Sequence, residues 1–446
     1  MRQSPTWRNG RLRRLKARNV LAAALGVLAL VPLFAGAASA SAGADTTYSE
    51  TVTSVASPSV LSAPFIADTT VLGMVASSPS NAWVAGSLAD RLLIAHWNGS
   101  TWSRVTSLEA YGAFTAISMD SPSDVWAVGS VDQGATERWL VAHWNGSRWS
   151  RVTSLEPPGA FAAISLDSPS DAWAVGYLNQ VSTANDPLWL VAHWNGKTWS
   201  RDTSVPKVRG QLDGVVAVDG DVWVSGYSAA KNTLLMLHRT GGHWYVVPTS
   251  APATSSVRVS FAASSRTSIW ASTVSNAGDN YLLHWNGSVW KKAAVPAWAD
   301  GDFLSGLSAA PGGGVWAVGS NYLTGADPLS MYWNGKDWAH VAVPAVKGAG
   351  LQGVTAIPGG TAWAVGSYLK PTAAGSYAEP LILHWSGKAW TIVKSPQIGS
   401  PSYSWGGLSA VTATSPGNAW ALGWECADRC NGLFSVLLHW NGKTWS

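Results

Sequence analysis

Short apolar runs alternate with polar turns along most of this chain, in a pattern that recurs roughly every 50 residues. In one copy the apolar runs are Ala162–Leu166, Ala172–Tyr177 and Leu188–Trp194. An Asn-Gly pair follows, which predicts a tight type I′ hairpin, and then comes Thr198–Ser204, rich in Trp and Thr. Each copy therefore predicts four short strands, and no stretch has the apolar stripe of a helix.

Two motifs mark every copy. The first reads Asp-Ala-Trp-Ala-Val-Gly at 171–176, and its Trp recurs as Trp83, Trp126, Trp173, Trp223, Trp270, Trp316, Trp363 and Trp420. The second reads His-Trp-Asn-Gly-x-x-Trp at 96–102, 143–149, 193–199, 284–290 and 439–445, with variants that start at His238, Tyr332 and His384. Four antiparallel strands repeated at this interval predict an all-β fold. We expect a single β-propeller of eight four-stranded blades over residues 45–446.

The ends of the chain predict how this ring closes. Residues 47–54 resemble the sequence 101–107, which is the predicted fourth strand of the first copy. The last copy stops at Ser446, part-way through its fourth strand. We hypothesise that the N- and C-terminal strands pair, with 46–55 lying against 437–446. Such pairing would remove exposed sheet edges.

Charge is sparse and unevenly placed. Only 12% of residues are charged while 47% are hydrophobic, which argues against disorder. Residues 1–44 hold seven of the 29 basic residues and no acid, so the remainder carries 22 basic against 25 acidic side chains. This slightly acidic body predicts no nucleic-acid partner.

Residues 1–44 have the parts of an export signal. A basic stretch ends at Arg18, an apolar run extends from Val20 to about Phe34, and small residues follow. We interpret this segment as a signal peptide, with an uncleaved N-terminal anchor as the alternative. The expected location is therefore secreted or extracellular, with association with the cell envelope as an alternative and membrane contact only through an uncleaved signal. We expect a monomer.

The Trp-Ala-Val-Gly and His-Trp-Asn-Gly-x-x-Trp motifs resemble those of secreted bacterial β-propellers that are often grouped with kelch and galactose-oxidase-like propellers. The second motif is also similar to the repeat of fucose-binding propeller lectins. The resemblance covers about residues 70–446 and implies the propeller fold. Galactose oxidase needs copper ligands that include a Tyr joined to a Cys. The two cysteines here are Cys426 and Cys430, so that chemistry is not supported.

Most histidines recur at one position of the second motif. They are His96, His143, His193, His238, His284, His384 and His439. Equivalent positions of different blades are spread around a ring and cannot converge on one ion, so we expect each to tie its own blade together by hydrogen bonds. We expect no metal and no cofactor.

Acidic and thiol side chains also have structural interpretations. Asp124 and Asp171, with Asn81 at the matching place, follow Ser-Pro-Ser turns, and we expect such residues to bond their own backbone. Cys426 and Cys430 predict one disulfide that pins a loop of the last copy in an exported protein.

Loop variation predicts where a ligand binds. The second-to-third strand loops and the blade-to-blade loops vary in length, whereas the other turns are nearly uniform, and variable loops on a rigid scaffold usually carry binding. Six tryptophans fall outside the repeated positions: Trp7, Trp139, Trp189, Trp298, Trp405 and Trp424. An indole face suits a sugar ring, although such residues also pack under loops. We expect Trp298, Trp405 and Trp424 to bind ligand, with polar partners Asp300, Glu425 and Asp428.

No catalytic motif accompanies these residues. Neither a Gly-x-Ser-x-Gly elbow, a phosphate loop nor a calcium loop occurs in the sequence. We therefore expect a secreted, non-catalytic propeller that binds carbohydrate or another extracellular ligand. The alternatives are a structural or protein-interaction propeller of the cell envelope, and a propeller hydrolase or lyase with a dispersed polar site.

Overall fold

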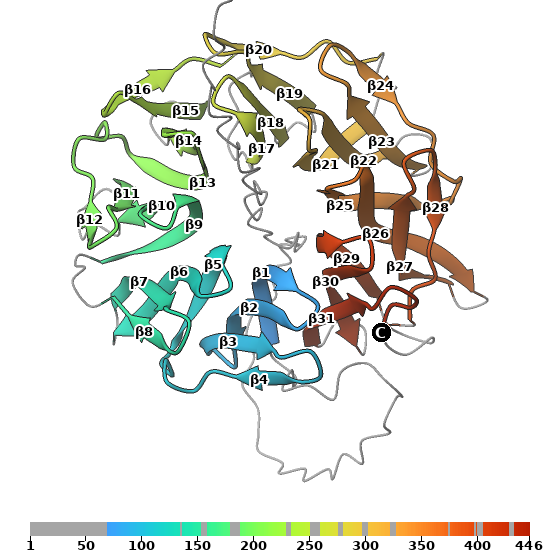
Figure 1. Cartoon of the computed structure of the whole chain (residues 1–446), viewed down its shortest axis with the longest axis horizontal. Helices are drawn as coiled ribbons and strands as arrows, with labels where there is room; N and C mark the ends of the chain where they lie inside the picture. The colour runs from blue at the N-terminus through green and yellow to red at the C-terminus, as the bar shows by residue number, and fades with distance from the viewer. Residues whose placement is uncertain are drawn as a thin grey trace, which may run out of the picture.

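Eight antiparallel sheets surround a central axis in the computed structural model (Figure 1). It describes residues 69–446 except 134–135, 153–157, 179–187, 229–232, 250–258, 275–279, 297–301, 322–326, 373–374, 397, 399–404 and 428–431. The strands of each sheet follow chain order from the axis outward, so every sheet is one blade. The predicted all-β, eight-bladed propeller is confirmed.

The blades are numbered in chain order. Blade 1 comprises β1 (Thr69–Ser78), β2 (Asn81–Leu88), β3 (Arg91–Trp97) and β4 (Trp102–Arg104). Blade 2 comprises β5 (Gly112–Ser121), β6 (Asp124–Gln133), β7 (Thr136–Trp144) and β8 (Trp149–Arg151). Blade 3 comprises β9 (Gly159–Ser168), β10 (Asp171–Leu178), β11 (Leu188–Trp194) and β12 (Trp199–Arg201). Blade 4 comprises β13 (Gly210–Val218), β14 (Asp221–Ser228), β15 (Thr233–Thr240) and β16 (His243–Val247).

The second half of the ring repeats this arrangement. Blade 5 comprises β17 (Val259–Ser265), β18 (Ser268–Val274), β19 (Asn280–Trp285) and β20 (Trp290–Lys292). Blade 6 comprises β21 (Asp302–Ala309), β22 (Val315–Asn321), β23 (Asp327–Trp333) and β24 (Trp338–His340). Blade 7 comprises β25 (Ala349–Ile357), β26 (Thr361–Thr372), β27 (Gly375–Trp385) and β28 (Trp390–Ile392). Blade 8 comprises β29 (Trp405–Ser415), β30 (Asn418–Ala427) and β31 (Gly432–Trp440).

The last blade begins its fourth strand with the C-terminal residues themselves. Trp445 forms a bridge with Trp440, and the backbones of His439 and Ser446 exchange hydrogen bonds of 2.9 and 3.0 Å. The segment 46–55 lies outside the described residues, so its pairing with the C-terminal strand stays a prediction. Blade 8 packs directly against blade 1, where the Val71 amide donates to Ser435 Oγ at 2.7 Å.

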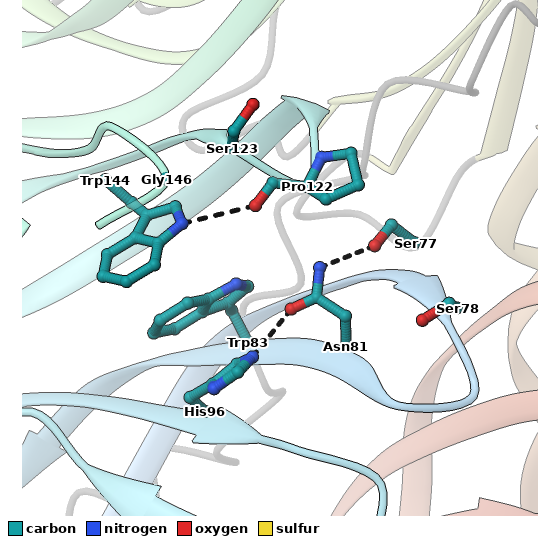
Figure 2. Close-up of a pocket in the computed structure, with 9 residues that line it drawn as sticks. All are labelled: Ser77, Ser78, Asn81, Trp83, His96, Pro122, Ser123, Trp144 and Gly146. Atoms are coloured by element: carbon teal, nitrogen blue, oxygen red, sulfur yellow. Dashed lines mark hydrogen bonds between the residues drawn. The ribbon is translucent and has the colours of Figure 1, made fainter. Parts of the chain in front are cut away.

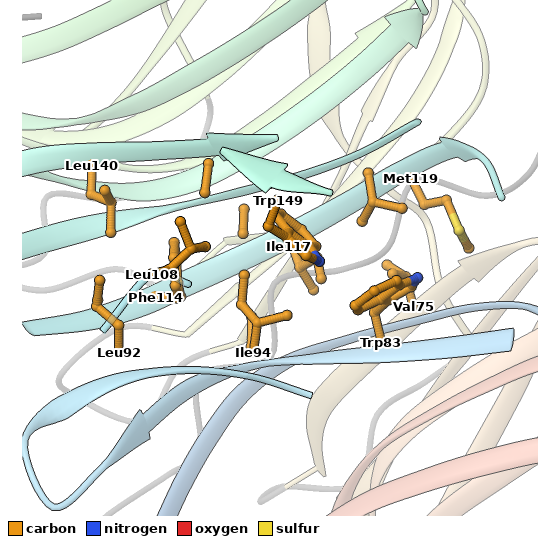
Figure 3. Packing of buried hydrophobic residues seen from close by; sticks show 14 residues of the cluster. Val75, Trp83, Leu92, Ile94, Leu108, Phe114, Ile117, Met119, Leu140 and Trp149 are labelled. Carbon is orange, nitrogen blue, oxygen red and sulfur yellow. The ribbon is translucent and has the colours of Figure 1, made fainter. Parts of the chain in front are cut away.

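The apolar cores lie between neighbouring blades. In the described residues every pair of adjacent blades shares one cluster, and the pair formed by blades 8 and 1 has its own. Figure 3 shows the cluster between blades 1 and 2, where Trp83 and Ile94 meet Phe114, Ile117 and Trp149. Middle strands are thus covered on both faces, which is why they read as continuous apolar runs.

The glycine of the first motif allows the two innermost strands of a blade to approach. A Cβ on Gly176 would lie 2.0 Å from the carbonyl oxygen of Ala160, and one on Gly319 would lie 1.7 Å from that of Phe303. The approach coincides with a β-bulge in the inner strand, which twists the ladder locally. Any larger residue at these positions would displace the strand beside the axis.

The predicted type I′ hairpin at Asn195-Gly196 is wrong. Only the glycine has a positive φ, of 86°, and the loop is four residues long because Trp194 pairs with Trp199. Asn195 Oδ1 accepts the backbone amides of Lys197 and Thr198 at 3.0 and 2.9 Å, so the side chain closes the loop. The fourth strand is accordingly shorter than predicted, running from Trp199 to Arg201.

Candidate functional site

Each blade carries a stacked pair made by its two motifs. In blade 1 the Trp83 and His96 rings stack at 4.1 Å, and His96 Nε2 lies 2.7 Å from Asn81 Oδ1 (Figure 2). Asn81 stands two residues before the motif tryptophan. The expectation that histidines tie their own blades together by hydrogen bonds is confirmed for His96, His143, His193, His284 and His439.

The residue two before the motif tryptophan is the partner in most blades. The distances from its side chain to histidine Nε2 are 2.7 Å for Asp124–His143, 2.8 Å for Asp171–His193, 3.3 Å for Asp221–His238, 3.4 Å for Ser268–His284 and 2.7 Å for Asn418–His439. The expectation that these turn acids bond their own backbone is therefore wrong. Asp124 and Asp171 each bond the histidine of the third strand instead.

Blade 6 has a compensating pair of substitutions at this place. Tyr332 replaces the histidine and Gly314 replaces the acceptor, and a Cβ on Gly314 would lie 2.0 Å from the tyrosine hydroxyl oxygen. The longer phenol thus fills the space that an acceptor side chain would need. Blade 7 keeps the histidine but pairs it with no acceptor, because His384 Nε2 and Thr361 Oγ1 are both buried without a hydrogen-bond partner.

Two tryptophans of the next blade cover each motif tryptophan. Trp144 and Trp149 of blade 2 lie 5.0 and 5.4 Å from Trp83 of blade 1, the second edge-on. The same contact joins the two ends of the chain, where Trp97 and Trp102 of blade 1 lie 5.3 and 5.5 Å from Trp420 of blade 8. The repeated tryptophans are therefore clamps between blades.

One interface departs from this rule. In blade 4 the residue after the histidine is Arg239, and its guanidinium lies 4.7 Å from the ring centre of Trp173. Asp202 sits beside it, 4.0 Å from Arg239 Nε, and accepts a 2.8 Å hydrogen bond from Trp244 Nε1. A cation–π contact thus replaces an indole between blades 3 and 4.

A cleft of about 390 Å³ opens between blades 1 and 2 (Figure 2). It lies on the face that carries the short, uniform turns, which we call the short-turn face; the opposite face carries the variable loops. The cleft is lined by Ser77, Ser78, Asn81, Trp83, His96, Pro122, Ser123, Trp144 and Gly146. Its volume lies within the range of small-molecule sites, and its wall combines indole with hydroxyl and amide groups.

Hydrogen bonds hold the polar wall in one arrangement. Asn81 Nδ2 donates to Ser77 Oγ at 2.7 Å while its Oδ1 bonds His96, so Ser77 accepts one bond and keeps its own proton to donate. Trp144 Nε1 donates to the Pro122 carbonyl at 3.3 Å, which fixes the half-buried indole. Burial lowers the pKa of His96, so the imidazole at the cleft is neutral at neutral pH. The cleft offers an uncharged, preorganised surface.

The residues predicted to bind ligand lie elsewhere. Trp298, Asp300 and Asp428 are outside the described residues. Trp405 and Trp424 are in β29 and β30, where the backbone of Trp405 pairs with Cys426 and that of Trp424 pairs with Gly407. Glu425 pairs with Gly406 and belongs to the face opposite Trp424.

Other sequence predictions have mixed outcomes. Trp139 and Trp189 are both 5% exposed and belong to inter-blade cores, so they follow the packing alternative. Cys430 lies outside the described residues, so the disulfide with Cys426 stays a prediction. The sequence did not predict the cleft. Asn81, the hydrogen-bond acceptor in its wall, could have been found as the residue two before the motif tryptophan.

The part of the chain that the structure describes contains no group of three or more His, Cys, Asp or Glu side chains placed to hold a metal ion. No helix within the same residues is long and apolar enough to cross a bilayer.

No family model and no curated protein match this chain. Among solved structures, a prolyl endopeptidase aligns with a TM-score of 0.47 and 13% identity, covering 79% of this chain and 52% of its own. The lectin BP39L from Burkholderia pseudomallei aligns with a TM-score of 0.45 and 15% identity, covering 75% of this chain and 100% of its own.

A fungal lectin with a six-bladed β-propeller fold and fucose recognition, from Aleuria aurantia, is a third structural neighbour. It aligns with a TM-score of 0.37 and 14% identity, covering 64% of this chain and 97% of its own. At such identities the likeness concerns the fold alone. None of these alignments carries an argument about ligand or activity.

Proposed function

We propose that this protein is an exported, non-catalytic propeller that binds carbohydrate in the cleft between blades 1 and 2. The observation that carries the proposal is the composition of that cleft. A half-buried indole, Trp144, stands beside Ser77, Ser78, Asn81 and other polar groups, and no carboxylate lines the space. Sugars bind through C–H faces that stack on indoles and hydroxyls that bond to small polar side chains.

The fixed hydrogen-bond pattern supports a neutral ligand rich in hydroxyl groups. Ser77 has a proton to donate, and its oxygen is already held by Asn81. A hydroxylated ligand can supply acceptors to such donors without burying a charge, which an ionic ligand would do here at a cost. The orientation of these groups precedes binding, so little ordering entropy opposes it.

Two acidic side chains of the repeat are already occupied by hydrogen bonds, which supports the non-catalytic part of the proposal. Asp124 and Asp171 each accept from the histidine of their own blade. Export rests on residues 1–44, whose basic and apolar segments precede the propeller. The tryptophans of the variable-loop face, Trp405 and Trp424, are a second candidate location for the sugar on the same molecule.

A blocking substitution tests the proposal. Ser123 is exposed at the rim of the cleft, and Thr267 occupies the matching turn of blade 5, away from it. Binding of the exported protein to a glycan array is measured for the parent chain, Ser123→Trp and Thr267→Trp. We expect a tenfold or greater loss of affinity for Ser123→Trp alone, roughly 1.4 kcal/mol of binding free energy.

Three results would contradict the proposal. A parent chain that retains no glycan would remove the carbohydrate function. Equal glycan binding by Ser123→Trp and Thr267→Trp would show that the cleft is not the binding site. Loss of glycan binding in Trp424→Ala would then place the site on the variable-loop face.

A further inference from the structure

The blades differ in the charge of the group that faces the imidazole of the second motif, which is half-buried in most of them. Carboxylates face it in three successive blades, through Asp124, Asp171 and Asp221, although in the third of these burial outweighs Asp221 and lowers the pKa of His238. Uncharged groups face it in blades 8 and 1, through Asn418 and Asn81, which bond the imidazole at 2.7 Å each.

Blade 7 belongs with the uncharged group. His384 lies 4.5 Å from Trp363 and its Nε2 is buried without a partner. Blades 7, 8 and 1 therefore form one uninterrupted arc in which the imidazole has no carboxylate to pair with. Blade 5, where Ser268 faces His284 at 3.4 Å, is isolated between a carboxylate blade and the tyrosine blade.

The same arc contains the seam of the ring. Blades 8 and 1 come from opposite ends of the described chain. Side-chain packing and the bond from the Val71 amide to Ser435 join them, whereas other neighbouring blades are also joined by a connecting segment. His439 of blade 8 lies at this seam, stacked at 3.9 Å on Trp420 and 5.8 Å from Trp97 of blade 1. A change in the charge of His439 thus acts directly on the closing contact.

We propose that acid opens this ring at one arc, blades 7, 8 and 1, because the half-buried imidazoles there face uncharged groups while those of blades 2 and 3 bond carboxylates. A proton on His143 creates an ion pair with Asp124 and keeps the existing bond. A proton on His439 places an unpaired charge between two blades, which burial opposes.

The direction of the pH effect follows from burial. Burial alone lowers the pKa of His96 and His384, and it lowers the pKa of His439 to about 4. No titratable side chain contributes to these three shifts; the neighbours of His439 are Asn418, Trp420 and Trp97, and Lys443 is exposed in the following loop. When the arc is open, its histidines take up protons at the ordinary histidine pKa. Closure is therefore favoured above that pKa and weakens as the pH falls toward the lowered pKa of the histidines in the closed ring.

Regional hydrogen exchange of the full chain tests this inference. After correction for intrinsic rates, peptides from β2–β3, β26–β27 and β30–β31 should show an opening equilibrium that rises on the order of tenfold between about pH 7 and about pH 4.5. Peptides from β6–β7 and β10–β11 should change far less. Uniform exchange around the ring, or faster exchange in blades 2 and 3, would overturn the inference.

Matched substitutions exchange the two classes of blade. Asn81→Asp with Asn418→Asp supplies carboxylates that Ser77 and Thr414 can still bond, and we expect the opening of blades 8 and 1 to require a lower pH. Asp171→Asn should make blade 3 open as the pH falls, as blades 7, 8 and 1 do in the parent chain. An unchanged pH profile in both variants would contradict the inference, and neither readout depends on sugar binding.

Discussion

Replacing Trp173 by alanine tests whether the repeated tryptophans hold the blades together. Trp173 is 1% exposed and stacks on His193 at 4.0 Å. Arg239 lies over its other side at 4.7 Å, and Trp244 meets it edge-on at 5.7 Å. The side chain is thus enclosed by its own blade and the next one, so its truncation empties an interface.

The expected loss follows from the buried area. A fully buried indole removes about 200 Å² from water, worth about 5 kcal/mol at about 25 cal/mol per Å². Partial burial in the unfolded chain reduces this figure, and the cavity left behind adds to it. We therefore expect Trp173→Ala to lower the free energy of unfolding by about 3–5 kcal/mol.

Urea denaturation followed by far-ultraviolet circular dichroism measures the loss, and Trp424→Ala is the matched control. Trp424 is half-buried in β30, outside the clamp positions, so its truncation should cost roughly half as much or less. Equal losses for the two variants, or a loss below about 1 kcal/mol for Trp173→Ala, would refute the assignment of clamp and non-clamp positions.

Three further outcomes are expected. Gly314→Ala should destabilise blade 6, because its Cβ would lie 2.0 Å from the Tyr332 hydroxyl oxygen, and Tyr332→His in the same chain should restore the melting temperature; a double variant no more stable than the single one would contradict the pairing. Burial raises the pKa of Tyr177 to about 12, so ultraviolet titration of the parent chain against Tyr177→Phe should assign one of the last ionisations to it. Reduction of the predicted Cys426–Cys430 disulfide should leave the melting temperature nearly unchanged, since so short a ring restricts little chain entropy; a large shift in calorimetry would argue against it.

Much of the fold could be predicted because the repeat carries its own signals. Apolar runs such as Leu188–Trp194 identify strands covered on both faces, and the recurrence of tryptophans such as Trp173 gives eight equivalent blades. The turn geometry at Asn195-Gly196 was mispredicted because the dipeptide favours one local conformation, whereas the asparagine side chain bonds two following amides and selects a longer loop.

The amino-acid sequence by itself determined the class of fold, the number of blades and the residues that recur in their cores, since these follow from periodic burial. Only the tertiary structure decided what the recurring polar residues do. Asn81 belongs to blade 1 and Trp144 to blade 2, more than one repeat later in the sequence. They line one cleft because the two blades pack side by side. Likewise, Trp97 of the first blade reaches Trp420 of the last through closure of the ring, a contact that local sequence patterns do not encode.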